Sequence, residues 1–349
     1  MPITRSNPFR GSGLPNMTLY PTADAGAVGK LLSMCPAHAQ TPLVEAPELA
    51  ETVGVARITI KDERGRMGLG SFKALGAAFA IAREAAEVVQ GDAWGSALTG
   101  RVFVTASAGN HGLSVAAGAN LFGAQAVIFL SNTVPEAFAT RLKAKGAQVE
   151  RAGANYEESM EAALVWAAEK GYTLLSDSSW PGYTDPPFHV MEGYLQLAAE
   201  AAVQIDTPPT HILLQAGVGG LAAAAAVYAR SVWGDGPKII VVEPDQAPAL
   251  FDSIGAGEVV TSSGGVSEMG RLDCKTPSMI ALAGLSRDAD TFLTLTEEEV
   301  AHGITVLGEY GFATTPSGGA GLAALFAGID GIGPDAHVMC ILSEGPEDV

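Results

Sequence analysis

The chain has 349 residues, of which 48% are hydrophobic and 17% are charged, so we expect a compact globular protein rather than a disordered one. The formal net charge is −18, and no block rich in lysine or arginine interrupts the sequence, which argues against a nucleic-acid partner. No apolar run approaches the 18 residues that a membrane-spanning helix needs.

The cysteines and the N-terminus bear on location. Cys35, Cys274 and Cys340 are widely separated and show no zinc-type spacing, so no metal site is expected. They fit small buried side chains in a reducing compartment. The first residues lead into a segment rich in proline and glycine and lack the apolar core of a signal peptide. These features predict a cytoplasmic protein without membrane association.

Strands and helices are predicted to alternate along most of the chain. Residues 1–40 are expected to be irregular apart from one short helix. The predicted strands cover 57–63, 102–105, 126–130, 148–151, 172–175, 211–215 and 238–242. The predicted helices cover 111–121, 136–145, 155–170 and 221–232. This order is typical of parallel sheets with helices on both faces.

A lysine between small and aromatic residues stands out in the segment Gly70-Ser71-Phe72-Lys73-Ala74-Leu75-Gly76. An ammonium group is costly to bury without a partner, which makes lysine a poor packing residue here. A desolvated lysine can lose its proton and act as a nucleophile that forms a Schiff base. Taken alone, Lys73 also fits a surface lysine whose stem lies along an amphipathic helix.

A second segment, Thr105-Ala106-Ser107-Ala108-Gly109-Asn110-His111-Gly112, is predicted as a strand-to-helix turn. A third, Gln215-Ala216-Gly217-Val218-Gly219-Gly220-Leu221, also follows an apolar strand and precedes an alanine-rich helix. Its glycines would let backbone N–H groups approach a phosphate at the start of a helix. Gly217, Gly219 and Ala222 also satisfy the dinucleotide fingerprint G-x-G-x-x-A, with Glu243 at the end of the next strand. The third segment alone therefore leaves a nicotinamide dehydrogenase open.

The Lys73 and Asn110 segments together resemble the fold-type II enzymes that use pyridoxal phosphate (PLP), which include the serine and threonine dehydratases. The resemblance implies two α/β lobes, each a mostly parallel sheet with helices on both faces, and PLP in the cleft between them. Lys73 would form the Schiff base, and the Asn110 side chain would contact the 3′-oxygen of PLP. The remaining cofactor contacts would come from Phe72, Gly217, Val218, Gly219, Gly220, Leu221 and Ser343, the last of these at the pyridine nitrogen.

The same resemblance assigns the substrate site to the turn at Ser107, Ala108, Gly109 and His111, whose N–H groups would hold the substrate carboxylate. His111 itself is interpreted as a packed or backbone-bonded histidine rather than a general base. Ser343, as a neutral hydroxyl, would make the ring a weaker electron sink than an aspartate would, which suits elimination of a group at Cβ. The sequence around Ser343 also fits an ordinary serine at the end of a strand.

The segment Ser176-Asp177-Ser178-Ser179-Trp180-Pro181-Gly182-Tyr183 narrows the resemblance to the diaminopropionate ammonia-lyase family, together with Gly193-Tyr194. Asp177 falls where that family carries an aspartate that serves the substrate, and Tyr183 would contact the substrate. Aspartate after a strand is also common as a turn or cap residue. The chain departs from the pattern of that family at Ala108. The family has an aspartate at this position, whereas threonine dehydratases have alanine.

These observations predict a PLP-dependent lyase that removes the β-substituent of an L-amino acid, with L-2,3-diaminopropionate as the favoured substrate. The alternatives are a serine/threonine or hydroxyaspartate dehydratase, a nicotinamide dehydrogenase built on the Gly217 loop, and a PLP-binding protein without catalysis. We expect a large lobe from residues 1–85 and 188–349, a small lobe from residues 86–187, and a homodimer.

Overall fold

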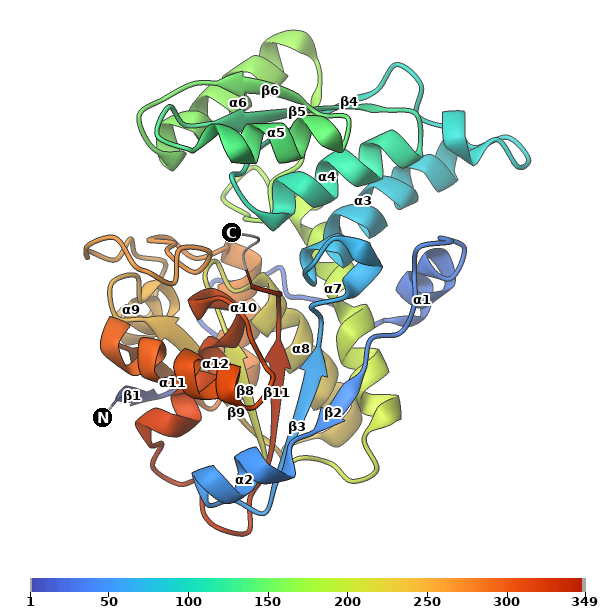
Figure 1. Ribbon diagram of the computed structural model, residues 1–349. Helices are drawn as coiled ribbons and strands as arrows, with labels where there is room; N and C mark the ends of the chain where they lie inside the picture. The colour runs from blue at the N-terminus through green and yellow to red at the C-terminus, as the bar shows by residue number, and fades with distance from the viewer. Residues whose placement is uncertain (1, 347–349) are drawn as a thin grey trace.

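The computed structural model describes residues 2–346 and contains two parallel sheets in two lobes, as the fold prediction required. The seven-stranded sheet has the order β1-β10-β9-β8-β11-β3-β2, and the four-stranded sheet has the order β6-β5-β4-β7. Only the two edge strands of the large sheet, β1 and β2, run antiparallel to their neighbours. Figure 1 shows the small sheet and its helices above the large sheet.

The strands of the large lobe are β1 (Ile3–Ser6), β2 (Leu43–Glu45), β3 (Arg57–Asp62), β8 (His211–Gln215), β9 (Lys238–Pro244), β10 (Thr291–Leu295) and β11 (His337–Leu342). The strands of the small lobe are β4 (Val102–Ala106), β5 (Gln125–Leu130), β6 (Gln148–Arg151) and β7 (Thr173–Leu174).

The helices occupy the faces of both sheets. They are α1 (Gly26–Leu32), α2 (Pro47–Val53), α3 (Lys73–Val88), α4 (Asn110–Leu121), α5 (Glu136–Ala144), α6 (Tyr156–Lys170), α7 (Asp185–Gln204), α8 (Gly220–Trp233), α9 (Ala249–Ala256), α10 (Met279–Asp288), α11 (Glu297–Glu309) and α12 (Pro316–Ala327). Two short 3₁₀ helices lie at Arg66–Gly68 and Trp94–Ser96.

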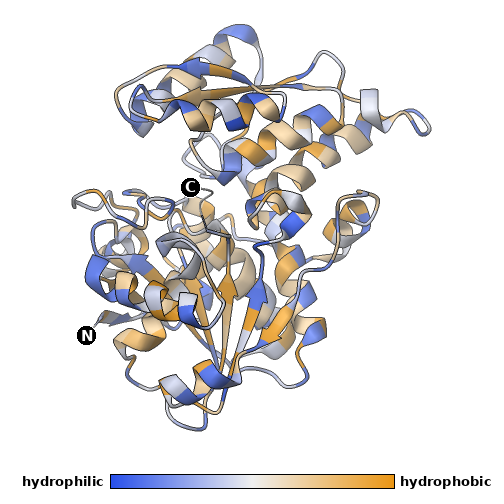
Figure 2. Cartoon of the chain, in the orientation of Figure 1, coloured by the Kyte–Doolittle hydropathy of each residue, from blue (hydrophilic) through white to orange (hydrophobic). Residues whose placement is uncertain are grey.

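The central strands are hydrophobic along their whole length because helices cover both of their faces. Every residue of β4 and β11 is buried, and Figure 2 shows the hydrophobic colour gathered in the strands of the large sheet. The predicted strands and helices from residue 57 onward are confirmed, and their ends differ from the observed ends by at most two residues. The expectation for residues 1–40 missed β1, whose alternating polar residues only become a strand by pairing with β10.

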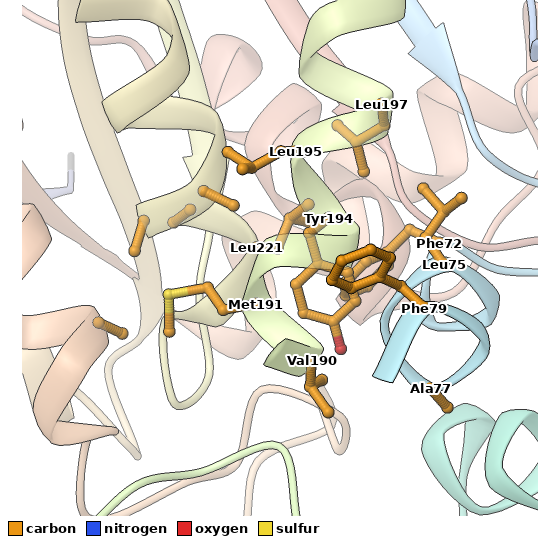
Figure 3. Packing of buried hydrophobic residues seen from close by; sticks show 14 of the residues in the cluster. Phe72, Leu75, Ala77, Phe79, Val190, Met191, Tyr194, Leu195, Leu197 and Leu221 are labelled. Carbon is orange, nitrogen blue, oxygen red and sulfur yellow. The ribbon is translucent and has the colours of Figure 1, made fainter. Parts of the chain in front are cut away.

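Helices α3 and α7 cross closely beside the cleft. A Cβ on Gly193 of α7 would lie 2.5 Å from the carbonyl oxygen of Leu75, and a Cβ on Gly76 of α3 would lie 2.6 Å from the ring of Tyr194. Glycine is therefore required on both helices for this approach. In Figure 3 the Tyr194 ring lies against Phe72 at the beginning of α3, and the two ring centroids are 4.9 Å apart.

The predicted boundaries after residues 85 and 187 lie inside α3 and α7, so the exact division of the chain into lobes stays a prediction. Across residues 2–346, none of the helices combines the length and the apolar character needed to cross a membrane.

Candidate active site

Lys73 is the first residue of α3, and the turn before it is fixed to the end of β11. The Phe72 N–H donates to the carbonyl of Ser343 (3.0 Å), and the Gly345 N–H donates to the carbonyl of Gly70 (3.0 Å). Gly70 has φ +82°, a conformation that favours glycine. The lysine is thus placed by backbone pairing with a strand that lies about 270 residues later in the chain.

The ammonium of Lys73 pairs directly with the carboxylate of Asp177, which follows β7 in the small lobe. Their side chains are only 23% and 17% exposed. Burial acts to lower the pKa of Lys73, but the charge of Asp177 outweighs it and raises the pKa above the usual range. Burial acts to raise the pKa of Asp177, but Lys73 lowers it well below the usual range. The pair is therefore most stable with Lys73 protonated and Asp177 ionised.

Two aromatic rings lie close to the ammonium group of Lys73. Its Nζ lies 5.2 Å from the ring centroid of Phe72 and 5.7 Å from that of Tyr194, within the range of a cation–π contact. Tyr194 is 1% exposed. The two rings exclude water from one side of the ammonium group.

The glycine loop between β8 and α8 fits a bound phosphate. Gly219 precedes α8 with φ +97°, and the first N–H groups of any helix have no acceptor within it. A Cβ on Gly217 would lie 3.0 Å from the Cα of Leu272 and 3.1 Å from the Sγ of Cys274. Glycine is therefore required for this close approach, and a glycine loop at the start of a helix offers backbone N–H groups of the kind that bind phosphate. Val218, Gly220 and Leu221 complete it.

The contact of Ser343 with the pyridine nitrogen stays a prediction, and the structure shows the surroundings of this serine. It follows β11, is 4% exposed, and donates its N–H to the carbonyl of Gly318 (3.1 Å). Its Oγ lies 3.5 Å from the same carbonyl, which leaves the hydroxyl able to make a second contact.

The turn after β4 is held in shape by Ser107. Its Oγ accepts from the N–H groups of Gly109 (3.2 Å) and Gly112 (3.1 Å), and Asn110 begins α4. The substrate carboxylate would then meet the N–H groups of Asn110 and His111, which belong to the first turn of α4. Ala108 lies half-buried in the same turn.

His111 is 5% exposed, and its Nε2 lies 2.8 Å from the carbonyl of Leu175. Burial lowers its pKa, so the ring is neutral near pH 7 and donates this hydrogen bond. The geometry agrees with the interpretation of a backbone-bonded histidine.

Tyr183 uses its hydroxyl for the backbone. It donates to the carbonyl of Leu174 (2.8 Å) and accepts from the N–H of Ser176 (3.0 Å), while its ring stacks on Trp180 at 4.3 Å. These contacts hold the segment that leads to Asp177. The hydroxyl of Tyr183 already makes two contacts within the protein. The substrate contact predicted for Tyr183 would therefore have to come from its ring.

Sequence reasoning missed three side chains at the site, Glu344, Arg271 and Cys274. Glu344 accepts from the amide of Asn110 and from Arg271 Nη1 (2.8 Å). Burial raises the pKa of Cys274 to about 12, so this thiol packs on the glycine loop rather than reacting. The position of Glu344 directly after Ser343 could have indicated that it lies at the site. Nothing in the sequence connects Arg271 with the cleft.

Glu243, which completes the dinucleotide fingerprint, has another use. Its carboxylate accepts from the N–H groups of Leu250 and Phe251, each at 2.7 Å, and is fully buried at the beginning of α9. A ribose hydroxyl would have to displace these bonds, which counts against the nicotinamide dehydrogenase.

A model of the pyridoxal-phosphate dependent enzymes matches residues 34–344. The chain belongs to this family of PLP enzymes. It is 33% identical to diaminopropionate ammonia-lyase of Escherichia coli strain K12 over 341 residues, which cover 88% of this chain and 85% of the relative. It is 28% identical to L-threonine ammonia-lyase of Thermotoga maritima over 89% of this chain and 72% of the relative.

Solved structures agree with the sequence comparison. The holo form of diaminopropionate ammonia-lyase from Escherichia coli superimposes on this PLP enzyme with a TM-score of 0.87 at 30% identity, covering 99% of this chain and 94% of that one. The same enzyme in complex with D-serine gives a TM-score of 0.88 at 29% identity, covering the same fractions. The predicted fold and the predicted cofactor, PLP, are confirmed.

Proposed function

We propose that this PLP enzyme is an ammonia-lyase that acts on L-2,3-diaminopropionate, giving pyruvate and two molecules of ammonia after addition of water. The observation that carries the proposal is the contact between Lys73, the first residue of α3, and Asp177. The similarity to diaminopropionate ammonia-lyases over most of the chain supports it.

When PLP is bound, it withdraws electrons from the Cα of the substrate and so makes the Cα proton acidic. Lys73 would hold the cofactor covalently, and the phosphate would lie on the N–H groups of Gly217 to Leu221. As a free amine, Lys73 would take the proton from the Cα of the substrate. The N–H groups of Asn110 and His111 would hold the carboxylate and so fix which face of Cα meets the lysine.

Asp177 has a role that depends on the substrate. In the structure its carboxylate contacts an ammonium group, that of Lys73. A substrate with an ammonium group at Cβ offers the same partner when Lys73 is engaged elsewhere. The carboxylate can then accept a hydrogen bond from this group and orient it for departure.

Borohydride reduction of the holoenzyme followed by peptide mapping tests the proposed Schiff base. We expect the reduced cofactor on the peptide that contains Lys73, and Lys73→Ala should lose steady turnover. Label on another lysine would refute the assignment.

Ala108 favours a second candidate, a dehydratase of serine, threonine or hydroxyaspartate, because threonine dehydratases resemble the chain at this position. A panel of L-amino acids assayed for oxo-acid release separates the two. Asp177→Asn sharpens the test: it should reduce turnover of diaminopropionate more than that of serine, because only the former carries the distal ammonium. Equal losses would favour the dehydratase.

We also propose a homodimer that acts in the cytoplasm. The proposal rests on the family resemblance and on three free cysteines dispersed over the chain. Light scattering after size-exclusion chromatography would measure the mass in solution, and a monomeric mass would refute the dimer.

A further inference from the structure

Glu344 joins both lobes through one carboxylate. It follows Ser343 at the end of β11 and is 4% exposed. The side-chain amide of Asn110 and the hydroxyl of Thr315 donate to it, and Arg271 Nη1 donates at 2.8 Å. These contacts supply one cation and two neutral donors for a buried carboxylate, which would otherwise be costly to hold away from water.

The partners of Glu344 come from distant parts of the fold. Asn110 begins α4 in the small lobe, and Thr315 precedes α12 in the large lobe. Arg271 lies in the long connection between α9 and α10. The backbone of Glu344 also forms an antiparallel bridge with Ser71, two residues before Lys73.

The segment that carries Arg271 also covers the glycine loop. The Cα of Leu272, the Sγ of Cys274 and the carbonyl oxygen of Arg271 all lie within 3.0–3.2 Å of the Cβ position on Gly217. The Nε of Arg271 lies 3.9 Å from the Cβ position on Gly109, in the turn that leads into α4. Residues 271–274 therefore touch both segments that are proposed to hold the ligands.

We propose that Glu344 is a positioning residue that fixes the Asn110 side chain and, through Arg271, holds residues 271–274 over the glycine loop. The position of the small lobe and the conformational order of residues 271–274 then depend on each other. The significance for catalysis rests on the proposed contact between Asn110 and the cofactor. The coupling itself is a property of the protein without PLP.

Hydrogen–deuterium exchange of the apoprotein, followed by mass spectrometry, tests the coupling. Glu344→Gln keeps the size of the side chain but removes its charge. Loss of one charge-assisted contact should speed exchange about tenfold in residues 107–113 and in residues 268–276. Release of PLP from the Glu344→Gln holoenzyme, measured by its absorbance after dilution, should quicken by a similar factor.

Arg271→Met provides the second arm, because it leaves the carboxylate and its contact with Asn110 in place. It should speed exchange in residues 268–276 and leave residues 107–113 nearly unchanged. Glu45→Gln is the matched control, since Glu45 also pairs with an arginine, Arg57, but on the surface of the large lobe (2.5 Å). It should change neither segment.

Wild-type exchange in both segments of Glu344→Gln would overturn the proposal, as would wild-type exchange of residues 268–276 in Arg271→Met. Neither result would affect the borohydride assignment of Lys73. Conversely, a label on another lysine would refute the proposed function and leave the exchange result standing.

Discussion

The contact between Lys73 and Asp177 determines the charge of both side chains. Both side chains lose most of their hydration, and each remains charged only because the other is present. When PLP is bound, Lys73 would hold it covalently, and Asp177 would no longer face a free lysine ammonium group. The aspartate is thereby ready for a cationic group on the substrate.

Ala108 determines the expected stereochemistry. Ala108 lies in the turn between β4 and α4, and its methyl group cannot move a proton, so the enzyme should act on L-isomers and not on D-isomers. Ala108→Asp should introduce measurable activity toward D-2,3-diaminopropionate. Chiral chromatography of the remaining substrate provides the measurement. Efficient turnover of a D-isomer by the unmodified protein would contradict this prediction and would require a second base, for which Asp177 is the candidate.

His111 should make stability depend on pH. Burial lowers its pKa, Asp177 opposes this effect and Lys73 adds to it, so the folded pKa lies below the value of 6.5 for a free histidine. Below pH 6.5 the unfolded chain binds the extra proton first, so the contribution of neutral His111 is complete above this pH and is lost as the pH falls.

The variant His111→Gln tests this dependence. Loss of the bond to Leu175 should cost about 1 kcal/mol at pH 8. The difference from the wild type should shrink at pH 5.5, as measured by urea unfolding of the apoprotein. The exposed His302 offers the control His302→Gln, which should leave the free energy of unfolding nearly unchanged. A constant difference for His111→Gln would mean that folding leaves the pKa of His111 unchanged, which would contradict this prediction.

At the scale of elements, the cleft is built where strands end and helices begin. α4 and α8 both start directly after parallel strands, β4 and β8, so their N-terminal N–H groups point to the same cleft. α3 contributes its own first residue, Lys73, from a turn that is bound to β11. Three separate helix starts thus supply the proposed contacts for phosphate, carboxylate and Schiff base.

Gly219 carries the clearest prediction for one of these helix starts. Its φ of +97° disfavours any side chain, and a Cβ would lie 3.1 Å from Ala281 Cβ and Leu250 Cδ1. Gly219→Ala should lower the free energy of unfolding by about 1–3 kcal/mol and reduce the PLP retained after dialysis. Gly171→Ala is the control: with φ +68° and no atom within 4 Å, it should lose some stability but keep its PLP. Full retention of PLP by Gly219→Ala would place the phosphate elsewhere.

At the scale of the whole molecule, the proposed cofactor site takes residues from both lobes. Lys73, the Gly217 loop and Ser343 belong to the large lobe, and Asn110 belongs to the small lobe. A ligand that contacts both should restrict their relative motion, since binding to the folded state alone stabilises it.

PLP should therefore stabilise the protein and protect both lobes. A concentration of 100 times the dissociation constant should add about 2.7 kcal/mol to the free energy of unfolding. Hydrogen exchange should slow both at residues 107–113 and at residues 217–221 in the holoenzyme. Slowing in the Gly217 loop alone would mean that Asn110 does not contact the cofactor.

Much of the architecture was predictable because it depends on local patterns. Apolar runs such as Val102 to Thr105 mark buried parallel strands, and alanine-rich runs after glycine mark the helices that follow them. The edge strand β1 was missed, because its residues 3–6 are mostly exposed and acquire a strand conformation only by pairing with β10.

The sequence by itself determined the order of strands and helices, the glycine loop at the start of α8 and the lysine at the start of α3. It did so because backbone conformation and burial leave a periodic record in neighbouring residues. Only the tertiary structure decided the partners. Asp177 meets Lys73 across 104 positions, and Glu344 meets Asn110 across 234. Such contacts depend on how packed lobes bring side chains together, and no local pattern of residues records that distance.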